Sequence, residues 1–187
     1  MAVIKGAILQ MPKRLNLTLA GLVACFVVGC ATQPNPTIGS AQRMQNVRTT
    51  AYTHSEGSGC HNALDSRLSG QHVMSAASDW SHFPLGTRFR IAETNEQYII
   101  DDYGGALIGT DTIDLYKPSR LEMKRWGVRH VDIDILQWGS EEESLKVLAV
   151  RTKHRCARQM VASLQQKKKE QQQKKLVADL YPLKKKT

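Results

Sequence analysis

The stretch from Tyr98 to Tyr116 (YIIDDYGGALIGTDTIDLY) constrains the fold more than any other part of the chain. Its pattern predicts an apolar strand, a glycine-rich turn and a second strand. The two strands carry four acidic residues: Asp101, Asp102, Asp111 and Asp114. A carboxylate at the end of an apolar strand is poorly solvated, which raises its pKa, most strongly where a second carboxylate lies near. Such acids suit general acid–base chemistry on a sugar polymer, although Asp and Gly are also ordinary turn residues.

Alternation of apolar and polar residues predicts further short strands on both sides of this stretch. They cover residues 46–53, 72–76, 87–92 and 129–138. A short helix is expected to begin at Pro118-Ser119, to run to about Trp126 and to be ended by Gly127. Six or so short strands with one small helix, in about 95 residues, predict an all-β barrel.

No cofactor motif interrupts this pattern. The sequence has neither a Rossmann glycine pattern nor a P-loop, so no nucleotide or other cofactor is predicted. The polar loop from Ser55 to Gly70 contains His61 and Cys60, but their spacing does not fit a structural or catalytic zinc site. We therefore predict no metal site.

The N-terminus predicts export. Lys13-Arg14 precede an apolar run that stops at Cys30, as in a secretory signal, and the run is shorter than the about 20 residues of a membrane span. Residues 27–30 (VVGC) resemble the lipobox of bacterial lipoproteins; residues 22–25 (LVAC) also fit but would leave an apolar FVVG after cleavage. We expect a signal peptide over 1–29, lipidation at Cys30 and a polar tether over 30–45.

This interpretation implies a place in the cell. Ala31 follows the lipidated cysteine, which under the lipoprotein rules of Gram-negative cells indicates an outer-membrane lipoprotein facing the periplasm. Two cysteines remain after Cys25 and Cys30, and in an oxidising compartment a disulfide between Cys60 and Cys156 is an open possibility.

The C-terminal part is basic and helical in pattern. Ser140 to Glu143 match a capping box, and apolar spacing predicts a helix over 140–164 that packs on the barrel. Residues 165–187 are a Lys/Gln-rich tail, expected as a frayed helix or disordered. Residues 141–187 hold thirteen Lys/Arg against five Asp/Glu, whereas the whole chain has a net charge of +9. The predicted barrel is therefore nearly neutral, which argues against nucleic-acid binding.

Six short motifs stand in a familiar order. They are Thr50-Ala51-Tyr52, residues 76–79 (AASD), 84–87 (PLGT), 102–106 (DYGGA), 113–116 (IDLY) and 126–128 (WGV). Together they resemble the 3D domain, which is named for three aspartates, here Asp79, Asp102 and Asp114. The resemblance spans about residues 46–139. It implies a six-stranded double-psi β-barrel, the fold of the catalytic barrel of membrane-bound lytic transglycosylase A and, more distantly, of rare lipoprotein A and expansins.

The resemblance also assigns roles. Asp114 matches the catalytic acid, with Asp102 beside it, and Asp79 matches an acid that is more structural. The residues implied to line the substrate groove are Thr50, Tyr52, Tyr103, Gly104 and Gly105. The segment before Ile113 is one residue longer than in the family pattern, which predicts a bulge that re-aims Asp114. The second domain that completes the groove of the large transglycosylase is also missing.

The function implied is cleavage of the β-1,4 bond between N-acetylmuramic acid and N-acetylglucosamine in peptidoglycan. The expected partners are peptidoglycan and a membrane through the N-terminal lipid, with no nucleic acid, no known protein partner and a monomeric state. Two alternatives stay open. One is a non-catalytic, expansin-like module whose aromatic residues stack on sugars: Trp80, Trp126, Trp138 and Tyr103. The other is an envelope interaction protein that uses the basic helix.

Overall fold

The computed structural model describes residues 42–56 and 59–180. The predicted signal peptide (1–29) and lipidation site Cys30 lie outside the described residues, as do the first part of the predicted tether and the last seven residues of the tail.

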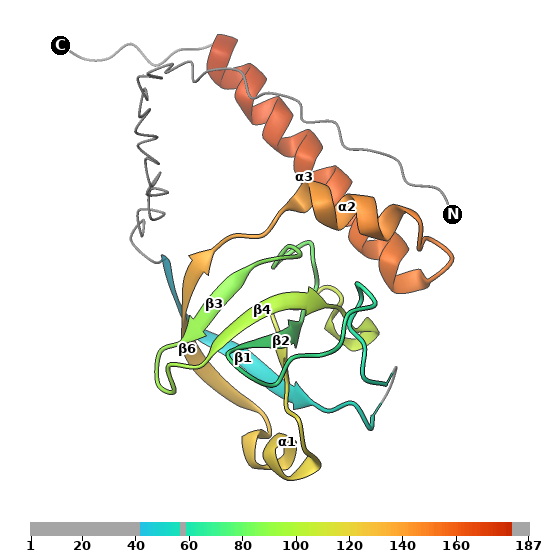
Figure 1. Cartoon of the computed structure of the whole chain (residues 1–187). Helices are drawn as coiled ribbons and strands as arrows, with labels where there is room; N and C mark the ends of the chain where they lie inside the picture. Colours follow the sequence, from blue (N-terminus) through green and yellow to red (C-terminus); the bar gives the residue numbers. More distant parts are fainter. Residues whose placement is uncertain (1–41, 57–58, 181–187) are drawn as a thin grey trace, which may run out of the picture. The chain divides into compact units, whose positions relative to one another are not determined.

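Six strands close into a barrel, as the sequence predicts (Figure 1). They are β1 (Gln42–Tyr52), β2 (Val73–Ala77), β3 (Arg88–Ile91), β4 (Gln97–Asp102), β5 (Ile113–Tyr116) and β6 (Arg129–Gln137). Their order around the barrel is β1-β5-β2-β4-β3-β6. β1 runs parallel to β5 and β2 parallel to β4, while the other neighbours are antiparallel.

Two sequence boundaries need correction. β1 begins at Gln42, so residues 42–45 belong to the barrel and not to the tether. Gln42, Arg43 and Met44 pair with β6, and the Arg43 guanidinium binds the Asp134 carboxylate at 2.8 Å. Asp111 lies in the loop before β5, where it contacts His82, and not on the strand. Strand propensity alone does not show either point, because both depend on a partner distant in sequence.

The barrel interior follows the predicted alternation. Every second residue of β3, β4 and β6 points inward and packs in one apolar cluster, as period-2 patterning requires. The fully or nearly fully buried members include Phe89, Ile91, Tyr98, Ile100, Ile113, Leu115, Val131, Ile133 and Ile135.

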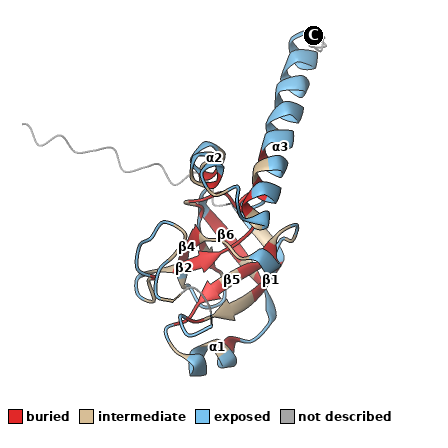
Figure 2. Ribbon diagram, turned by 90° about the vertical axis from the view of Figure 1, so that its right-hand side faces the viewer, coloured by how far each residue is buried: buried red, intermediate tan, exposed pale blue. Residues whose placement is uncertain are grey.

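The short helix α1 (Arg120–Trp126) forms where it is predicted. Ser119 caps it, since its hydroxyl accepts a hydrogen bond from the Glu122 N–H, and Gly127 ends it with a φ of 63°. α1 lies at one end of the barrel, and the two C-terminal helices lie at the other (Figures 1 and 2).

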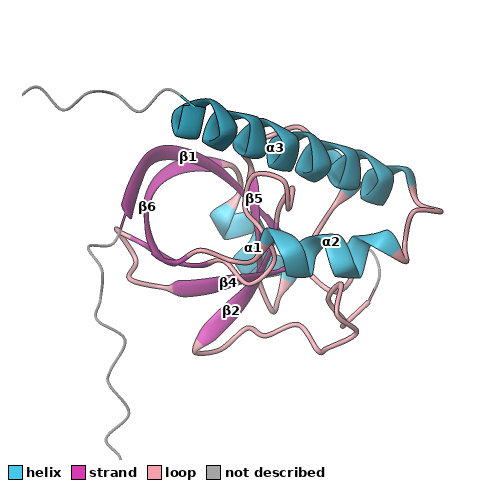
Figure 3. Cartoon of the chain, turned by 90° about the horizontal axis from the view of Figure 1, so that it is seen from above, coloured by secondary structure: helices cyan, strands magenta, loops and turns pink. Residues whose placement is uncertain are grey.

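The predicted helix over 140–164 is instead two helices, α2 (Glu141–Ala149) and α3 (Arg155–Leu180), joined by a turn. The turn lets both helices face the barrel: α2 buries Leu148, and α3 buries Ala157, Met160 and Leu164. The backbone N–H of Trp80 donates to the Met160 sulfur at 3.4 Å. Figure 3 shows α2 and α3 side by side above the strands.

The described part of the predicted tail is helical, because α3 continues to Leu180. Its second half has no buried residue and is drawn as exposed in Figure 2. No helix in the described part of the chain is long and apolar enough to cross a membrane.

Candidate functional site

Strand order brings the two predicted catalytic acids to one face of the barrel. Ala77, at the end of β2, pairs with Asp114 on β5 and with Asp102 on β4. Thr50 on β1 pairs with Asp114 from the other side. Because neighbouring strands lie about 4.8 Å apart, the Asp102 and Asp114 backbones are separated by roughly 10 Å, with β2 between them.

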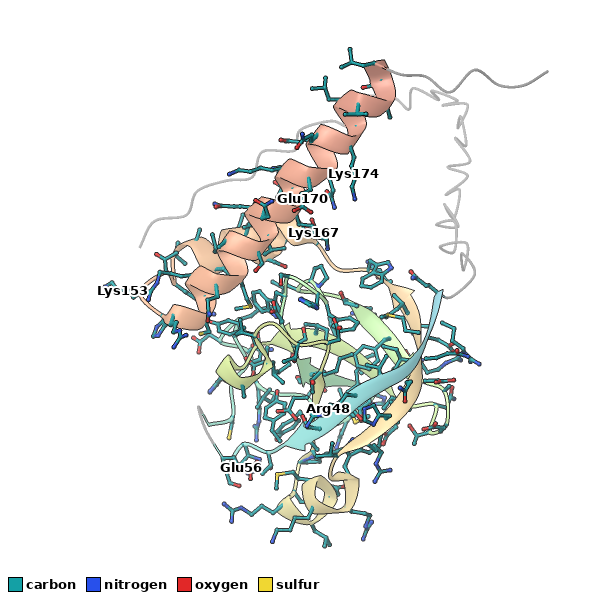
Figure 4. All side chains as sticks on the ribbon, turned by 180° about the vertical axis from the view of Figure 1, so that it is seen from behind. Arg48, Glu56, Lys153, Lys167, Glu170 and Lys174 are labelled. Atoms are coloured by element: carbon teal, nitrogen blue, oxygen red, sulfur yellow. The ribbon has the colours of Figure 1, made fainter. Side chains whose placement is uncertain are left out.

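The Asp114 carboxylate is partly buried and held from β1. The Thr50 hydroxyl donates to Asp114 Oδ1 at 2.6 Å. Burial raises the pKa of Asp114, and the negative charge of Glu56 adds to this, while the Thr50 hydrogen bond and the positive charge of Arg48 oppose it. Figure 4 shows Arg48 on β1 and Glu56 in the loop that follows.

The Asp102 carboxylate has a separate environment. It accepts hydrogen bonds from the Tyr103 N–H at 2.9 Å and from the Tyr52 hydroxyl at 3.3 Å. Burial raises the pKa of Asp102 to about 6; the charge of neighbouring Asp101 adds to the shift, and both hydrogen bonds oppose it. Burial and the nearby carboxylates also raise the pKa of Tyr52, so its hydroxyl stays protonated and can donate.

Asp101, next to Asp102 on β4, binds the loop that lines the site, a role that the sequence analysis did not identify. The register between β2 and β4 slips at Ala77, so Asp101 has no strand partner there. Its Oδ2 accepts from the Ser75 hydroxyl at 2.7 Å and from the Asn62 amide at 2.8 Å. Asn62 Oδ1 in turn accepts two backbone N–H groups of its own loop, so this one side chain ties the loop to the barrel.

The acids open into a cavity of about 150 Å³. Five predicted residues line it: Tyr52, Asp102, Tyr103, Gly104 and Asp114. Thr50 reaches it through its bond to Asp114, whereas Gly105 lines another cavity beside Cys156. The loop after β1 adds Thr53, Glu56, Gly59 and Leu68, which a polar, glycine-rich loop sequence could not place.

Asp79, which the resemblance implies to be structural, accepts hydrogen bonds from two loop segments. It is almost fully buried, and its Oδ1 accepts from the Ser81 N–H at 2.8 Å and the Ser81 hydroxyl at 2.7 Å. Its Oδ2 accepts from the Gly109 N–H at 2.7 Å, which fastens the loop before β5. The extra residue stays in that loop and does not enter β5. The register between β1 and β5 runs without a shift, so the predicted bulge at Asp114 is wrong.

Within the part of the chain that the structure describes, the cysteines and tryptophans that the sequence analysis names lie outside the cavity at the acids. Cys60 and Cys156, whose pairing the sequence leaves open, are both free thiols in the structure: Cys60 lies in the loop after β1 and Cys156 in the first turn of α3. Trp80 and Trp126 are core residues, whereas Trp138 is 43% exposed and stacks on Phe83. Within the described ranges no cluster of three His, Cys, Asp or Glu side chains could hold a metal ion.

Comparison with known proteins agrees with the motifs. Residues 74–137 match the family model described as the 3D domain, which confirms the resemblance. The chain matches no curated protein. Among solved structures, it is similar to the Streptomyces papain inhibitor (SPI), with 14% identity and a TM-score of 0.36, over 54% of this chain and 99% of that chain.

Proposed function

Because residues 74–137 carry a 3D domain, we propose that the protein is a lytic transglycosylase-like enzyme of peptidoglycan turnover, built on a double-psi barrel. The bond cleaved is the β-1,4 linkage between N-acetylmuramic acid and N-acetylglucosamine. One observation carries the proposal: Asp114 and Asp102, both with raised pKa values, face one cavity together with the Tyr52 hydroxyl. The two parallel strand pairs, β1·β5 and β2·β4, support the double-psi assignment.

Asp114 is the proposed acid and base. In its protonated form it gives a proton to the glycosidic oxygen as the bond to C1 of the muramoyl residue breaks. As a carboxylate it then takes the proton of the muramoyl C6 hydroxyl, whose oxygen attacks C1. The product is a 1,6-anhydro end, and Asp114 is protonated again. This route needs one acid–base group and no positioned water, unlike the two-carboxylate hydrolases.

Asp102 has a different role in this scheme. With a pKa of about 6 it is largely ionised near neutral pH, so its charge opposes the positive charge that develops on the sugar ring. The Tyr52 hydroxyl holds it in place. Burial and the negative charge of Glu56, not Asp102, are what raise the pKa of Asp114, which favours its protonated form.

One observation favours a second candidate, a wall-binding module that does not cut. The cavity of about 150 Å³ is smaller than the about 300–1,000 Å³ of usual ligand sites, so the described barrel does not enclose a disaccharide. An open surface of this kind binds a polymer along its length. In this alternative the carboxylates and Tyr103 contribute hydrogen bonds and stacking only.

We further propose that a lipid on Cys30 anchors the protein to the outer membrane, facing the periplasm, and that it acts as a monomer. The sequence motif around Cys30 supports this placement. Peptidoglycan is then within reach of the barrel, and neither nucleic acid nor a cofactor is needed.

The test is digestion of purified sacculi. Wild-type protein should release muropeptides with anhydro ends, lighter by one water than hydrolysed ends. Asp114→Asn should lower the rate by roughly 10²–10⁴-fold, which is the contribution of general acid–base catalysis. Asp179→Asn, an exposed carboxylate near the end of α3, is the matched control and should cut normally. No release by wild-type protein, with binding intact in Asp114→Asn, would favour the non-cutting module.

A further inference from the structure

Three successive side-chain pairs lie along β1. Thr50 pairs with Asp114 and Tyr52 with Tyr116 on β5, and Arg48 binds Thr112, which directly precedes β5. Alternate residues of a strand share one face and lie about 6.6 Å apart, so the three pairs form a row about 13 Å long. A polymer lying along β1 therefore meets a cation, then the proposed acid, then the Tyr52 ring, which packs edge-on against buried Tyr116.

A second cavity opens at the Arg48 end of this row. Its volume is about 360 Å³, within the usual range of ligand sites and larger than the cavity at the acids. Met44 and Phe83 supply apolar surface, and Asn46, Arg48 and Thr112 supply polar groups. A mixed apolar and polar lining suits a sugar, which has both kinds of face.

A bulge in β1 shapes the wall of this cavity. The register with β6 shifts between Met44 and Val47, so β1 holds one residue more than its partner. Asn46 takes a φ of 58° in the bulge, and its N–H donates to Asp132 Oδ1 at 3.0 Å. Bulges are common beside binding sites because they re-aim side chains, and this one lies two residues before Arg48.

The Arg48 guanidinium is available to a ligand. Arg48 is exposed, and its Nη1 donates to Thr112 Oγ1 at 3.1 Å. Arg43 and Arg90 are instead taken up by Asp134, and Asp111, which also lines the cavity, contacts His82. Within the described part of the chain no carboxylate forms an ion pair with Arg48. A guanidinium with free N–H groups binds a carboxylate through two parallel hydrogen bonds.

We propose that this second cavity is a subsite in which Arg48 binds a carboxylate of peptidoglycan, next to the bond that is cleaved at Asp114. The identity of the polymer rests on the proposed function. Peptidoglycan offers this chemistry from two sources: the lactyl carboxylate of muramic acid where the stem peptide has been removed, and the carboxylates of the stem peptide where it is present. Whichever source binds, the row of pairs along β1 puts it on the Arg48 side of the cleaved bond.

Three small probes separate the sources in an NMR titration of the full-length, ¹⁵N-labelled protein. N-Acetylmuramic acid carries a free lactyl carboxylate, muramoyl dipeptide carries its carboxylate on the peptide, and N-acetylglucosamine carries none. We expect one of the two acidic probes to shift the amide signals of Asn46, Arg48 and Thr112 and to bind about tenfold more tightly than N-acetylglucosamine. Equal binding of all three probes, or shifts confined to other residues, would overturn the proposal.

Matched variants then test Arg48 itself. Arg48→Gln should remove the advantage of the acidic probe. Arg88→Gln makes the same charge change at an exposed residue of β3, the strand opposite β5 in the barrel order, and should keep that advantage. If the acidic probe still binds more tightly than N-acetylglucosamine in Arg48→Gln, the proposed subsite is wrong. The readout does not require cutting, so a protein that shows the Arg48 effect but releases nothing from sacculi would refute only the proposed catalysis.

Discussion

Replacing Asp102 by Asn should make the protein more stable at neutral pH while impairing its activity. Burial is the main reason that the pKa of Asp102 is raised from 3.8 to about 6. The raised pKa means that the protonated carboxyl stabilises the fold fully below about pH 4, and that this stabilisation is lost as the pH rises through about 6. The loss amounts to about 3 kcal/mol at pH 7, because each pKa step corresponds to about 1.4 kcal/mol.

An Asn side chain keeps the contacts and loses the charge. Its oxygen can accept from the Tyr103 N–H, and its amide can donate to the Tyr52 hydroxyl. Thermal melting followed by circular dichroism should therefore show Asp102→Asn melting roughly 5–10 °C above wild type at pH 7.5. At pH 3 the two proteins should melt together. A variant that melts lower at pH 7.5, or that gains equally at pH 3, would refute burial of the charge as the cause.

Asp134→Asn is the control with the opposite sign. Hydrogen bonds from Arg43 and Arg90 lower the pKa of Asp134 to about 2. A lowered pKa stabilises the fold above about pH 4, and the effect is lost as the pH falls toward 2. Asp134→Asn should therefore melt below wild type at pH 7.5, and the difference should shrink in acid.

Three further changes test other parts of the structure. Gly139→Ala should cost about 3 kcal/mol in urea unfolding, because its Cβ would clash with the Leu85 and Pro84 carbonyl oxygens, whereas Gly105→Ala meets nothing within 4 Å and should be neutral. Asn62→Ala should cost about 1–3 kcal/mol, since it removes a donor to buried Asp101 and releases the loop; wild-type stability would contradict this. Cys30→Ser should leave the protein out of the outer-membrane fraction, and continued fractionation with lipid would point to Cys25 instead.

The barrel could be predicted from the sequence because its strands bury one face each. In β6, Val131, Ile133 and Ile135 alternate with polar residues, and this period holds whatever the neighbouring strands are. The caps of α1 are equally local, since Ser119 and Gly127 act on residues within one turn. Local signals of this kind survive folding unchanged.

The site itself depends on contacts between distant segments. The Glu56 charge raises the pKa of Asp114, and Asn62 binds Asp101, only because the loop after β1 lies beside the strands that carry these acids. The break between α2 and α3 is similar: helical spacing suits a continuous helix, but the turn buries Leu148 and Met160 on the same end of the barrel. No periodicity in the sequence encodes where such partners lie.

From the sequence, Asp102 is the expected like-charged neighbour of Asp114, and the structure shows a different one. Asp102 and Asp114 stand close along the chain with a glycine turn between them, which suggests two carboxylates that repel each other. The barrel order instead inserts β2 between β4 and β5, so Asp101 is the like charge beside Asp102, and Glu56 is the like charge beside Asp114. The pKa of Asp114 is shifted by burial, Thr50, Glu56 and Arg48, and Asp102 is not among these causes, so the two carboxyls titrate nearly independently. Removing the Asp102 charge should therefore slow the proposed reaction without moving the part of the pH profile that Asp114 sets, whereas Glu56→Gln should lower the pKa of Asp114 and move that part toward acid.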